Sequence, residues 1–264
     1  MINKEKGIEL LKRANDSAIQ NIQENGGPFG AVAVDQTGQN QIVGCNRVTD
    51  HLDPTAHAEV QAIRNHEEVY GEGSLQNGEI FTSCYPCPMC NAFMEEKGIS
   101  RSTYSSNKKD ADDAGFADDF LYVQQALLEE DKEPSVPVVL LPDDLRATLT
   151  PDHFYLLDET HSIIASCESD RLFNAIPKLT KQINTFETPN CFLVSSKELK
   201  ILDYMASCWM GIEKIYVLQQ EHLKIEKNAQ KVEHVYINVE NEGGPFQAWA
   251  KASDRKDYGL KPNA

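Results

Sequence analysis

A histidine, a glutamate and two cysteines have spacings that suit a metal-dependent hydrolase. His57-Ala58-Glu59 precedes the segment Pro86-Cys87-Pro88-Met89-Cys90. Zn²⁺ favours nitrogen and sulfur ligands in tetrahedral geometry, and a catalytic zinc site keeps one position for water. His57, Cys87 and Cys90 would supply the three protein ligands, and Glu59 would be left free for proton transfer. The sequence therefore predicts a hydrolytic site that holds one Zn²⁺ per chain.

Two predicted helices must bring these ligands together. Cys87 and Cys90 are three positions apart and so lie on one side of a helical turn. The prolines next to the first cysteine suit the start of a helix, where the positive end of the helix dipole favours thiolates. His57 is predicted to start another helix, with Asp53 or Thr55 as its cap. We expect two helix N-termini to converge on one cation.

Each motif has a simpler interpretation when it stands alone. A lone Cys-x-x-Cys is commonly half of a structural zinc site or a redox pair. The combination of His-x-Glu with Pro-Cys-x-x-Cys is the signature of zinc-dependent nucleobase deaminases. A closed structural site would need a fourth protein ligand, for which Cys84 is the obvious candidate. We expect Cys84 instead to be a neighbour at the end of a strand.

Five stretches of the first half carry a family resemblance. They are residues 26–32, Asn46, residues 53–60, residues 82–90 and residues 113–120. In these stretches the chain resembles the bacterial guanine deaminases of the cytidine-deaminase-like superfamily, and the Ala-Gly-Phe-x-Asp segment is more typical of the guanine branch. The resemblance implies a three-layer α/β/α fold with a mixed sheet. It also implies zinc-dependent hydrolysis of guanine to xanthine and ammonia.

The same resemblance implies roles for residues around the substrate. Asn46 and Asp118 match positions that hydrogen-bond the purine, and Phe29 matches the ring that stacks on it. Ala58 matches a backbone donor near the reacting atom. Guanine is flat and rich in hydrogen-bonding groups, so an aromatic face and fixed polar partners suit it. Catalysis itself is expected to depend on Glu59.

The length of 264 residues suggests two domains, which we place at 1–144 and 145–264. A charged stretch with prolines, residues 129–134, begins the junction, and residues 136–141 are predicted to form the last strand of the first domain. The order of predicted elements then repeats. The repeated strands are predicted at residues 153–158, 162–167, 191–196 and 210–216.

The second copy lacks the metal motif. It has Leu199, Lys200, Leu202 and Asp203 where the first copy has its cysteines, and no histidine stands at the counterpart of His57. We expect a degenerate deaminase-like domain without metal. Residues 245–249 and 256–258 resemble the guanine deaminase tail that crosses to a partner subunit and covers the active site, with Tyr258 over the ligand. Residues 259–264 extend past this tyrosine, which departs from the family pattern. The chain is expected to be a monomer that mimics this dimer, or a homodimer.

Composition limits the classes of partner. The formal net charge is −16 and the pI is about 4.8, which disfavours a nucleic-acid substrate. Seven cysteines do not form a disulfide framework. No apolar run approaches the roughly 20 residues that span a membrane, and the N-terminus opens into a helix rather than a signal peptide. We expect a cytoplasmic protein that acts on a small purine.

Two alternatives stay open. Pocket shape could select cytosine, cytidine, adenine or tRNA adenosine instead of guanine. The chain could also be a zinc protein that binds a purine without turnover, although a binding protein has no need of the proton carrier Glu59.

Overall fold

The computed structural model describes residues 2–150, 152–239 and 244–253. The chain forms two compact units, each with its own five-stranded sheet. The first unit contains residues up to 50, residues 56–118 and the chain from residue 229 onward. The second unit contains residues 51–55 and 119–228. Among the described residues, no helix is both long enough and apolar enough to cross a membrane.

The sheet of the first unit is mixed, with the strand order β12-β4-β3-β1-β2. Strand β1 is antiparallel to β2 and β3, whereas β3, β4 and β12 are parallel. The strands are β1 (Gly30–Val34), β2 (Gln41–Cys45), β3 (Glu79–Thr82), β4 (Arg101–Tyr104) and β12 (Glu233–Tyr236). The helices are α1 (Lys4–Gln23), α3 (Ala58–Tyr70), α4 (Pro88–Glu96), α5 (Lys108–Asp113) and α10 (Gly244–Lys251), and α2 (Val48–His51) leads into the second unit.

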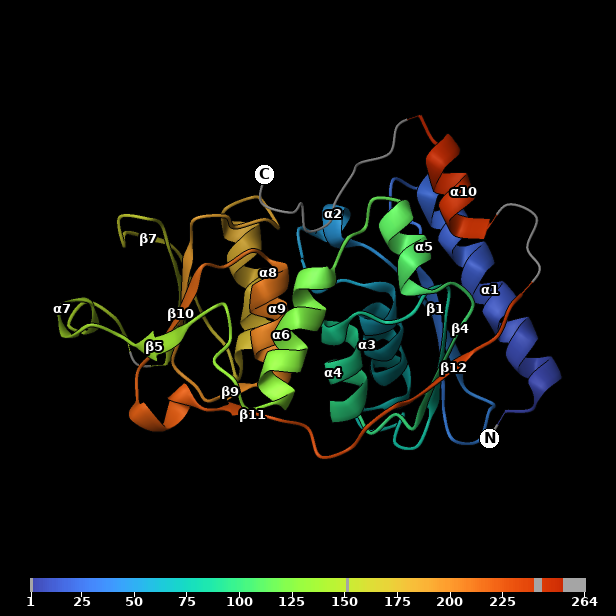
Figure 1. The fold of residues 1–264 in the computed structure, drawn as a ribbon, viewed down its shortest axis with the longest axis horizontal. Helices are drawn as coiled ribbons and strands as arrows, with labels where there is room; N and C mark the ends of the chain where they lie inside the picture. The colour runs from blue at the N-terminus through green and yellow to red at the C-terminus, as the bar shows by residue number, and fades with distance from the viewer. Residues whose placement is uncertain (1, 151, 240–243, 254–264) are drawn as a thin grey trace. The chain divides into compact units, whose positions relative to one another are not determined.

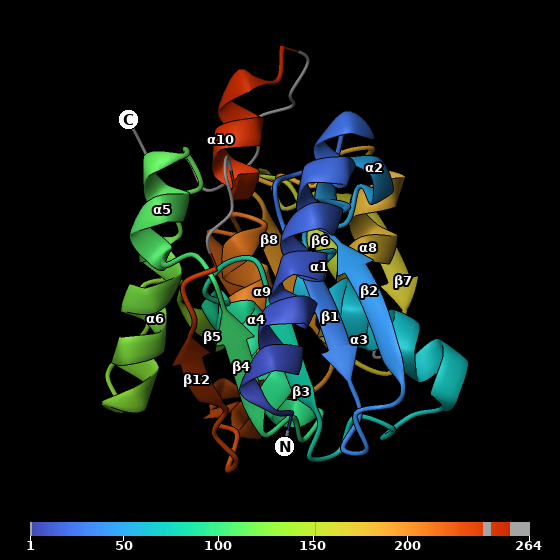
Figure 2. The ribbon, with the colours of Figure 1, turned by 90° about the vertical axis from the view of Figure 1, so that its right-hand side faces the viewer.

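Helices cover both faces of this sheet. Figures 1 and 2 show α1 on one face and α3 and α4 on the other. The apolar residues of α1 recur with the period of a helix, since Leu10, Leu11 and Ala14 pack on Val32, Val34 and Phe81. Its first turn is capped by the Asn3 side chain, which accepts a hydrogen bond from the Lys6 amide. The predicted three-layer α/β/α fold is confirmed in this unit.

Gly44 on β2 allows α3 to approach the sheet closely. A Cβ at this position would lie 2.1 Å from the amide nitrogen of Ala62 and 2.5 Å from the carbonyl oxygen of Ala58. No side chain could occupy that space without moving the helix. The missing side chain therefore helps to set the position of the α3 N-terminus, where His57 and Glu59 lie.

The second unit repeats this sheet, with the strand order β5-β10-β8-β6-β7. Strand β6 is antiparallel to β7 and β8, whereas β8, β10 and β5 are parallel. The strands are β5 (Val138–Leu140), β6 (His153–Leu157), β7 (Ile163–Glu168), β8 (Phe192–Ser195) and β10 (Lys214–Val217). The remaining elements are α6 (Asp119–Glu129), α7 (Asp143–Arg146), α8 (Leu172–Gln182), β9 (Leu199–Lys200), α9 (Ile201–Trp209), the 3₁₀ helix η1 (Gln220–Leu223) and β11 (Ile225–Glu226).

The two sheets therefore share both strand order and strand direction. The four repeated strands predicted in the second half are all present, as β6, β7, β8 and β10. The helix layers differ, because no described helix of the second unit corresponds to α1. The face of the second sheet that matches the α1-covered face of the first sheet is instead packed by Leu141, Leu145 and Leu149 from the α7 region, which contact Tyr155 and Tyr216.

The compact units do not divide the chain at residue 144. Residues 136–141 were predicted as the last strand of the first domain, and this was wrong, because β5 pairs in parallel with β10 of the second unit. The edge of the first sheet next to β4 is filled by β12, which follows the second unit in the chain. Strand pairing depends on which sheet edge is open and in register, so nearness in sequence did not decide it.

Candidate active site

The N-termini of α3 and α4 position the predicted metal ligands. His57 is the N-cap residue of α3, Cys87 is the N-cap residue of α4, and Cys90 lies in the first turn of α4. Pro88 opens α4, as predicted. The predicted cap of α3 was wrong, since the α3 helix begins after His57 and no side chain caps it.

Asp53 instead forms a local turn ahead of the helix. Its carboxylate accepts hydrogen bonds from the amide and the hydroxyl of Thr55, at 2.8 and 2.6 Å. A short acidic side chain satisfies nearby backbone donors in this way, which fixes the chain that leads to His57.

The three predicted ligands are brought together in the structure. Nδ1 of His57 lies 3.5 Å from Sγ of Cys87 and 3.5 Å from Sγ of Cys90. The ligand atoms all lie within 4.8 Å of one another, and all three residues are buried. One nitrogen and two sulfur donors at this separation fit a single Zn²⁺ with one coordination position left over. The residues present therefore suit the metal.

Cys84 does not join this group in the described residues. Its thiol is buried and donates a hydrogen bond to the carbonyl oxygen of Asn107 at 3.5 Å. It follows β3 by two residues, which agrees with the expected position near the end of a strand. Burial raises the pKa of this thiol well above its usual range. Cys84 is thus a neutral neighbour of the cluster.

The metal-free cluster shares its protons unequally. Burial would raise the pKa of Cys87, but hydrogen bonds from Cys90 and the charge of His57 hold it well below the usual range. Burial and the adjacent Cys87 thiolate raise the pKa of Cys90 well above its usual range. Burial would lower the pKa of His57, but the charge of Cys87 outweighs this effect and raises it. The cluster thus favours a Cys87 thiolate beside a protonated Cys90.

Zinc binding should therefore release protons. At neutral pH we expect the metal to displace about one proton from Cys90 and a further fraction from His57. Zinc affinity should fall as the pH falls, because the metal-free form binds more protons than the zinc-bound form. Isothermal titration calorimetry in buffers of different ionisation enthalpy measures the number of protons released per zinc ion bound. Cys90→Ala should lower this number of protons, and a zinc affinity that does not depend on pH would contradict the assignment of the protonated groups.

Glu59 lies beside the ligands in the first turn of α3. Its Oε1 accepts a hydrogen bond from the hydroxyl of Thr82 at 2.7 Å, and its Oε2 accepts one from Sγ of Cys90 at 3.4 Å. Burial raises the pKa of Glu59, and the hydrogen bond from Thr82 only partly offsets this effect. A carboxyl group with a raised pKa exchanges protons more readily near neutral pH. No role was predicted for Thr82, and its position at the end of β3 is the one local feature that could have indicated it.

Four aromatic rings form a cluster within the first unit. The ring centroids of Phe29 and Phe116 are 4.9 Å apart, and those of Phe29 and Phe246 are 5.6 Å apart. The ring of Trp249 lies 5.4 Å from that of Phe116. Phe246 and Trp249 come from α10, which packs beside α1 (Figure 1). The structure thus joins the C-terminal helix to the predicted stacking residue.

The remaining predicted substrate residues have different surroundings. Asn46 is buried, and its Oδ1 accepts a hydrogen bond from the Val48 amide, while Asn21 donates to its carbonyl oxygen at 2.9 Å. Ala58 is the first residue of α3, where backbone amides have no partner within the helix. Asp118 is partly buried, and burial together with the Cys87 charge raises its pKa to about 7. Tyr258 lies outside the described residues.

Comparison with known proteins agrees with this geometry. The family model for the cytidine and deoxycytidylate deaminase zinc-binding region matches residues 3–106, a stretch that includes all three ligands and Glu59. Guanine deaminase of Bacillus subtilis (strain 168) is 43% identical over 114 residues, which are 43% of this chain and 72% of that protein. The chain belongs to the cytidine and deoxycytidylate deaminase family. The matched region of this family binds zinc, so zinc is the metal that fits the cluster of His57, Cys87 and Cys90.

Other comparisons cover less of the chain or of the relative. The tRNA-specific adenosine deaminase of Haemophilus influenzae is 32% identical over 80 residues, which are 30% of this chain and 46% of that protein. The X-ray structure of the B. subtilis guanine deaminase shows 40% sequence identity and a TM-score of 0.43, and the match covers 47% of this chain and 77% of that one.

Proposed function

We propose that this deaminase hydrolyses guanine to xanthine and ammonia. The observation that carries the proposal is a buried carboxylate, Glu59, placed against a cluster of one imidazole and two thiols. The choice of guanine is supported by the 43% identity to a guanine deaminase and by the Ala-Gly-Phe-x-Asp segment at residues 114–118.

His57, Cys87 and Cys90 would hold the metal, and zinc bound in this way makes water acidic enough to ionise near neutral pH. Glu59 accepts a proton from that water. Glu59 passes this proton to the ring nitrogen as the water oxygen adds to C2 of guanine. It then carries the second proton of that oxygen to the amino group while the C2 carbonyl forms. The C2–N bond then breaks, and ammonia leaves. Thr82 keeps the Glu59 carboxylate oriented through both transfers.

The predicted substrate residues would recognise the purine from different sides. We propose that Phe29 stacks on the base and that Asn46 and Asp118 hydrogen-bond it. Among the described residues the side-chain amide nitrogen of Asn46 has no hydrogen-bond partner, whereas its oxygen is fixed by Val48. Asn46 is therefore oriented to donate. Asp118, with a pKa of about 7, can accept or donate close to neutral pH.

A panel of bases tests the assignment. The zinc-loaded protein is incubated with guanine, adenine, cytosine, cytidine and a tRNA substrate, and ammonia release is measured for each. Guanine should be deaminated fastest, and xanthine should appear in equal amount. Faster turnover of another compound would make that compound the proposed substrate in place of guanine. Guanine binding without ammonia release would indicate a binding protein. The net charge of −16 makes tRNA the least expected substrate.

The aromatic cluster gives a prediction about substrate affinity. Phe246→Ala removes a ring that packs against Phe29, so the stacking ring loses support. We expect KM for guanine to rise by about 5- to 20-fold, with a smaller change in kcat, in steady-state assays. The control is Gln247→Ala, an exposed position on the same helix. Equal KM values for both variants would show that α10 does not support the base.

A further inference from the structure

The second unit has two helix N-termini that correspond to the two at the active site of the first unit. In the first unit the ligands are the N-cap residue of α3, the N-cap residue of α4 and the third residue of α4. Helices α8 and α9 occupy the matching places after β7 and β8, and their N-cap residues also have extended backbones. The residues at the three matching positions are Arg171, Lys200 and Asp203.

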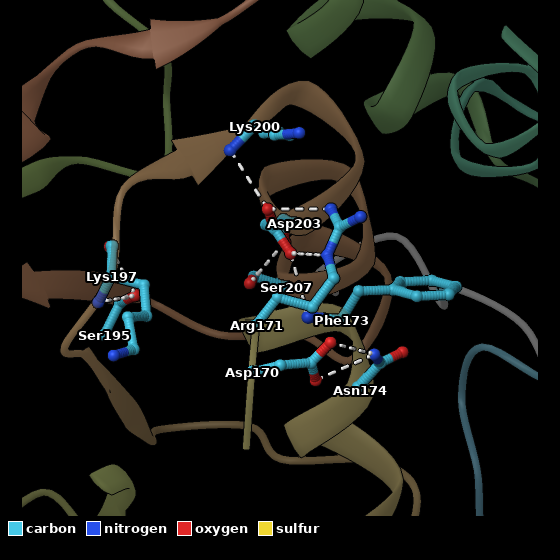
Figure 3. A network of polar contacts seen from close by, with 9 residues as sticks. All are labelled: Asp170, Arg171, Phe173, Asn174, Ser195, Lys197, Lys200, Asp203 and Ser207. Carbon is cyan, nitrogen blue, oxygen red and sulfur yellow. Dashed lines mark hydrogen bonds and ion pairs between the residues drawn. The ribbon is translucent and has the colours of Figure 1, made fainter. Parts of the chain in front are cut away.

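These residues form a network centred on one carboxylate (Figure 3). Asp203 accepts hydrogen bonds from Nε and Nη2 of Arg171 at 3.3 and 3.0 Å. It also accepts from the backbone amide of Phe173 in the first turn of α8 at 2.8 Å, and from the amide of Lys200 at 3.0 Å. Only 2% of the Asp203 side chain and 20% of the Arg171 side chain is exposed. The carboxylate therefore links the start of α8 to the start of α9.

We infer that the Arg171–Asp203 ion pair takes the structural place of the metal in the second unit. In the active site a cation would join the two helix starts through one residue of α3 and two of α4. In the second unit the guanidinium comes from the position of His57, and the carboxylate comes from the position of Cys90. The same two helix starts are joined, with a positive and a negative side chain instead of a metal and its ligands.

The second unit does not fit zinc. Arginine and lysine present only N–H donors, so Arg171 and Lys200 offer no lone pair to a metal, and only Asp203 could act as a ligand. The position of Glu59 is taken by Phe173, which has no proton to exchange. The second unit thus keeps the helix geometry of a deaminase without its metal or its proton carrier.

The packing explains why this pair can replace a metal as a cross-link. Both oxygens of Asp203 have two donors each, so the buried carboxylate is fully hydrogen-bonded. Charge-assisted bonds from a guanidinium are stronger and more directional than neutral ones. Removing one partner of such a buried pair leaves an uncompensated charge, which is strongly destabilising. The two residues should therefore act as one unit.

Hydrogen exchange of the zinc-loaded protein, with and without a chelator, tests the inference directly. Chelation should raise exchange rates in the first turns of α3 and α4 and leave those of α8 and α9 unchanged. Zinc content should be about one per chain. The inference is overturned if α8 and α9 lose protection on chelation, or if a second zinc is found. Neither hydrogen exchange nor zinc content depends on catalytic activity. The result of this experiment is therefore independent of whether guanine is the substrate.

Substitutions test the ion pair itself. Asp203→Asn and Arg171→Gln should each raise exchange in the first turns of both helices by about tenfold or more, and the double variant should be no worse than the worse single one. The control is Asp170→Asn, an exposed carboxylate just before α8 that accepts hydrogen bonds from Ser169 and from Asn174 of α8 but does not contact α9 in the described residues (Figure 3). Fully additive effects, or effects equal to the control, would refute the pair as a cross-link.

Restoring the ligand types provides the reverse test. The triple variant Arg171→His, Lys200→Cys and Asp203→Cys should raise zinc content from about one to about two per chain. Chelation should then raise exchange at α8 and α9 as well. A zinc content that stays at one would contradict the positional correspondence between the two units.

Discussion

Glu59→Gln should lower kcat/KM for guanine by about 10²–10⁴-fold and leave zinc binding intact. The amide keeps the shape of the carboxylate and its contact with Thr82, but it cannot carry a proton. Burial already disfavours the ionised form of Glu59, so the neutral amide should fold at least as stably as the parent. Steady-state kinetics measures kcat/KM, zinc analysis measures the metal content, and thermal unfolding measures the stability of the variant.

The matched control for this variant is Glu68→Gln. Glu68 lies on the same helix, α3, but is exposed to solvent. Glu68→Gln makes the same chemical change at a position outside the metal-ligand cluster. The kcat/KM of this variant should therefore match that of the parent. Full activity of Glu59→Gln would remove the proposed proton carrier. Loss of zinc from that variant would instead assign Glu59 to metal binding.

Cys87→Ala should abolish both metal binding and turnover. Cys87 supplies one of only three ligand atoms in the described cluster, and its thiolate is the group that is already charged without metal. Loss of residues that only support metal ligands costs about 10–100-fold in affinity, so loss of a ligand should weaken zinc binding by more than about 100-fold. Competition with a zinc-binding dye measures the affinity.

Cys84→Ala separates a ligand from a neighbour. Cys84 is equally buried and close in sequence, but its thiol hydrogen-bonds Asn107 instead of facing His57. This variant should keep about one zinc per chain and most of the activity. In the cobalt-substituted parent, absorption bands should indicate two thiolate ligands. Three thiolates, or loss of metal from Cys84→Ala, would describe a closed structural site and remove the catalytic proposal.

The local parts of the active site could be predicted from the sequence. Two cysteines three positions apart must lie on the same side of a helical turn, and Pro88 marks where that turn begins. The repeated order of predicted elements likewise located the strands of the second unit. These features depend on spacing and order along the chain, so the sequence alone determined them.

The partners of Glu59 and Asp203 were visible only in the structure. Thr82 is 23 residues from Glu59, and Arg171 is 32 residues from Asp203. No spacing rule joins such residues, because their distance depends on how the helices pack on the sheet. Leu199, Lys200, Leu202 and Asp203 were noted in the sequence only as replacements for cysteines. The ion pair became apparent when the N-caps of α8 and α9 were known.

The sequence by itself predicted the cluster of His57, Cys87 and Cys90, the start of α4 and the repeated order of strands. Only the tertiary structure decided which sheet receives β5 and which receives β12. The spacing of residues on one helical turn and the order of elements along the chain depend on the sequence alone. The pairing of an edge strand is instead selected by the free energy of the whole chain, because it requires an open edge, a matching register and a connecting segment that can reach it.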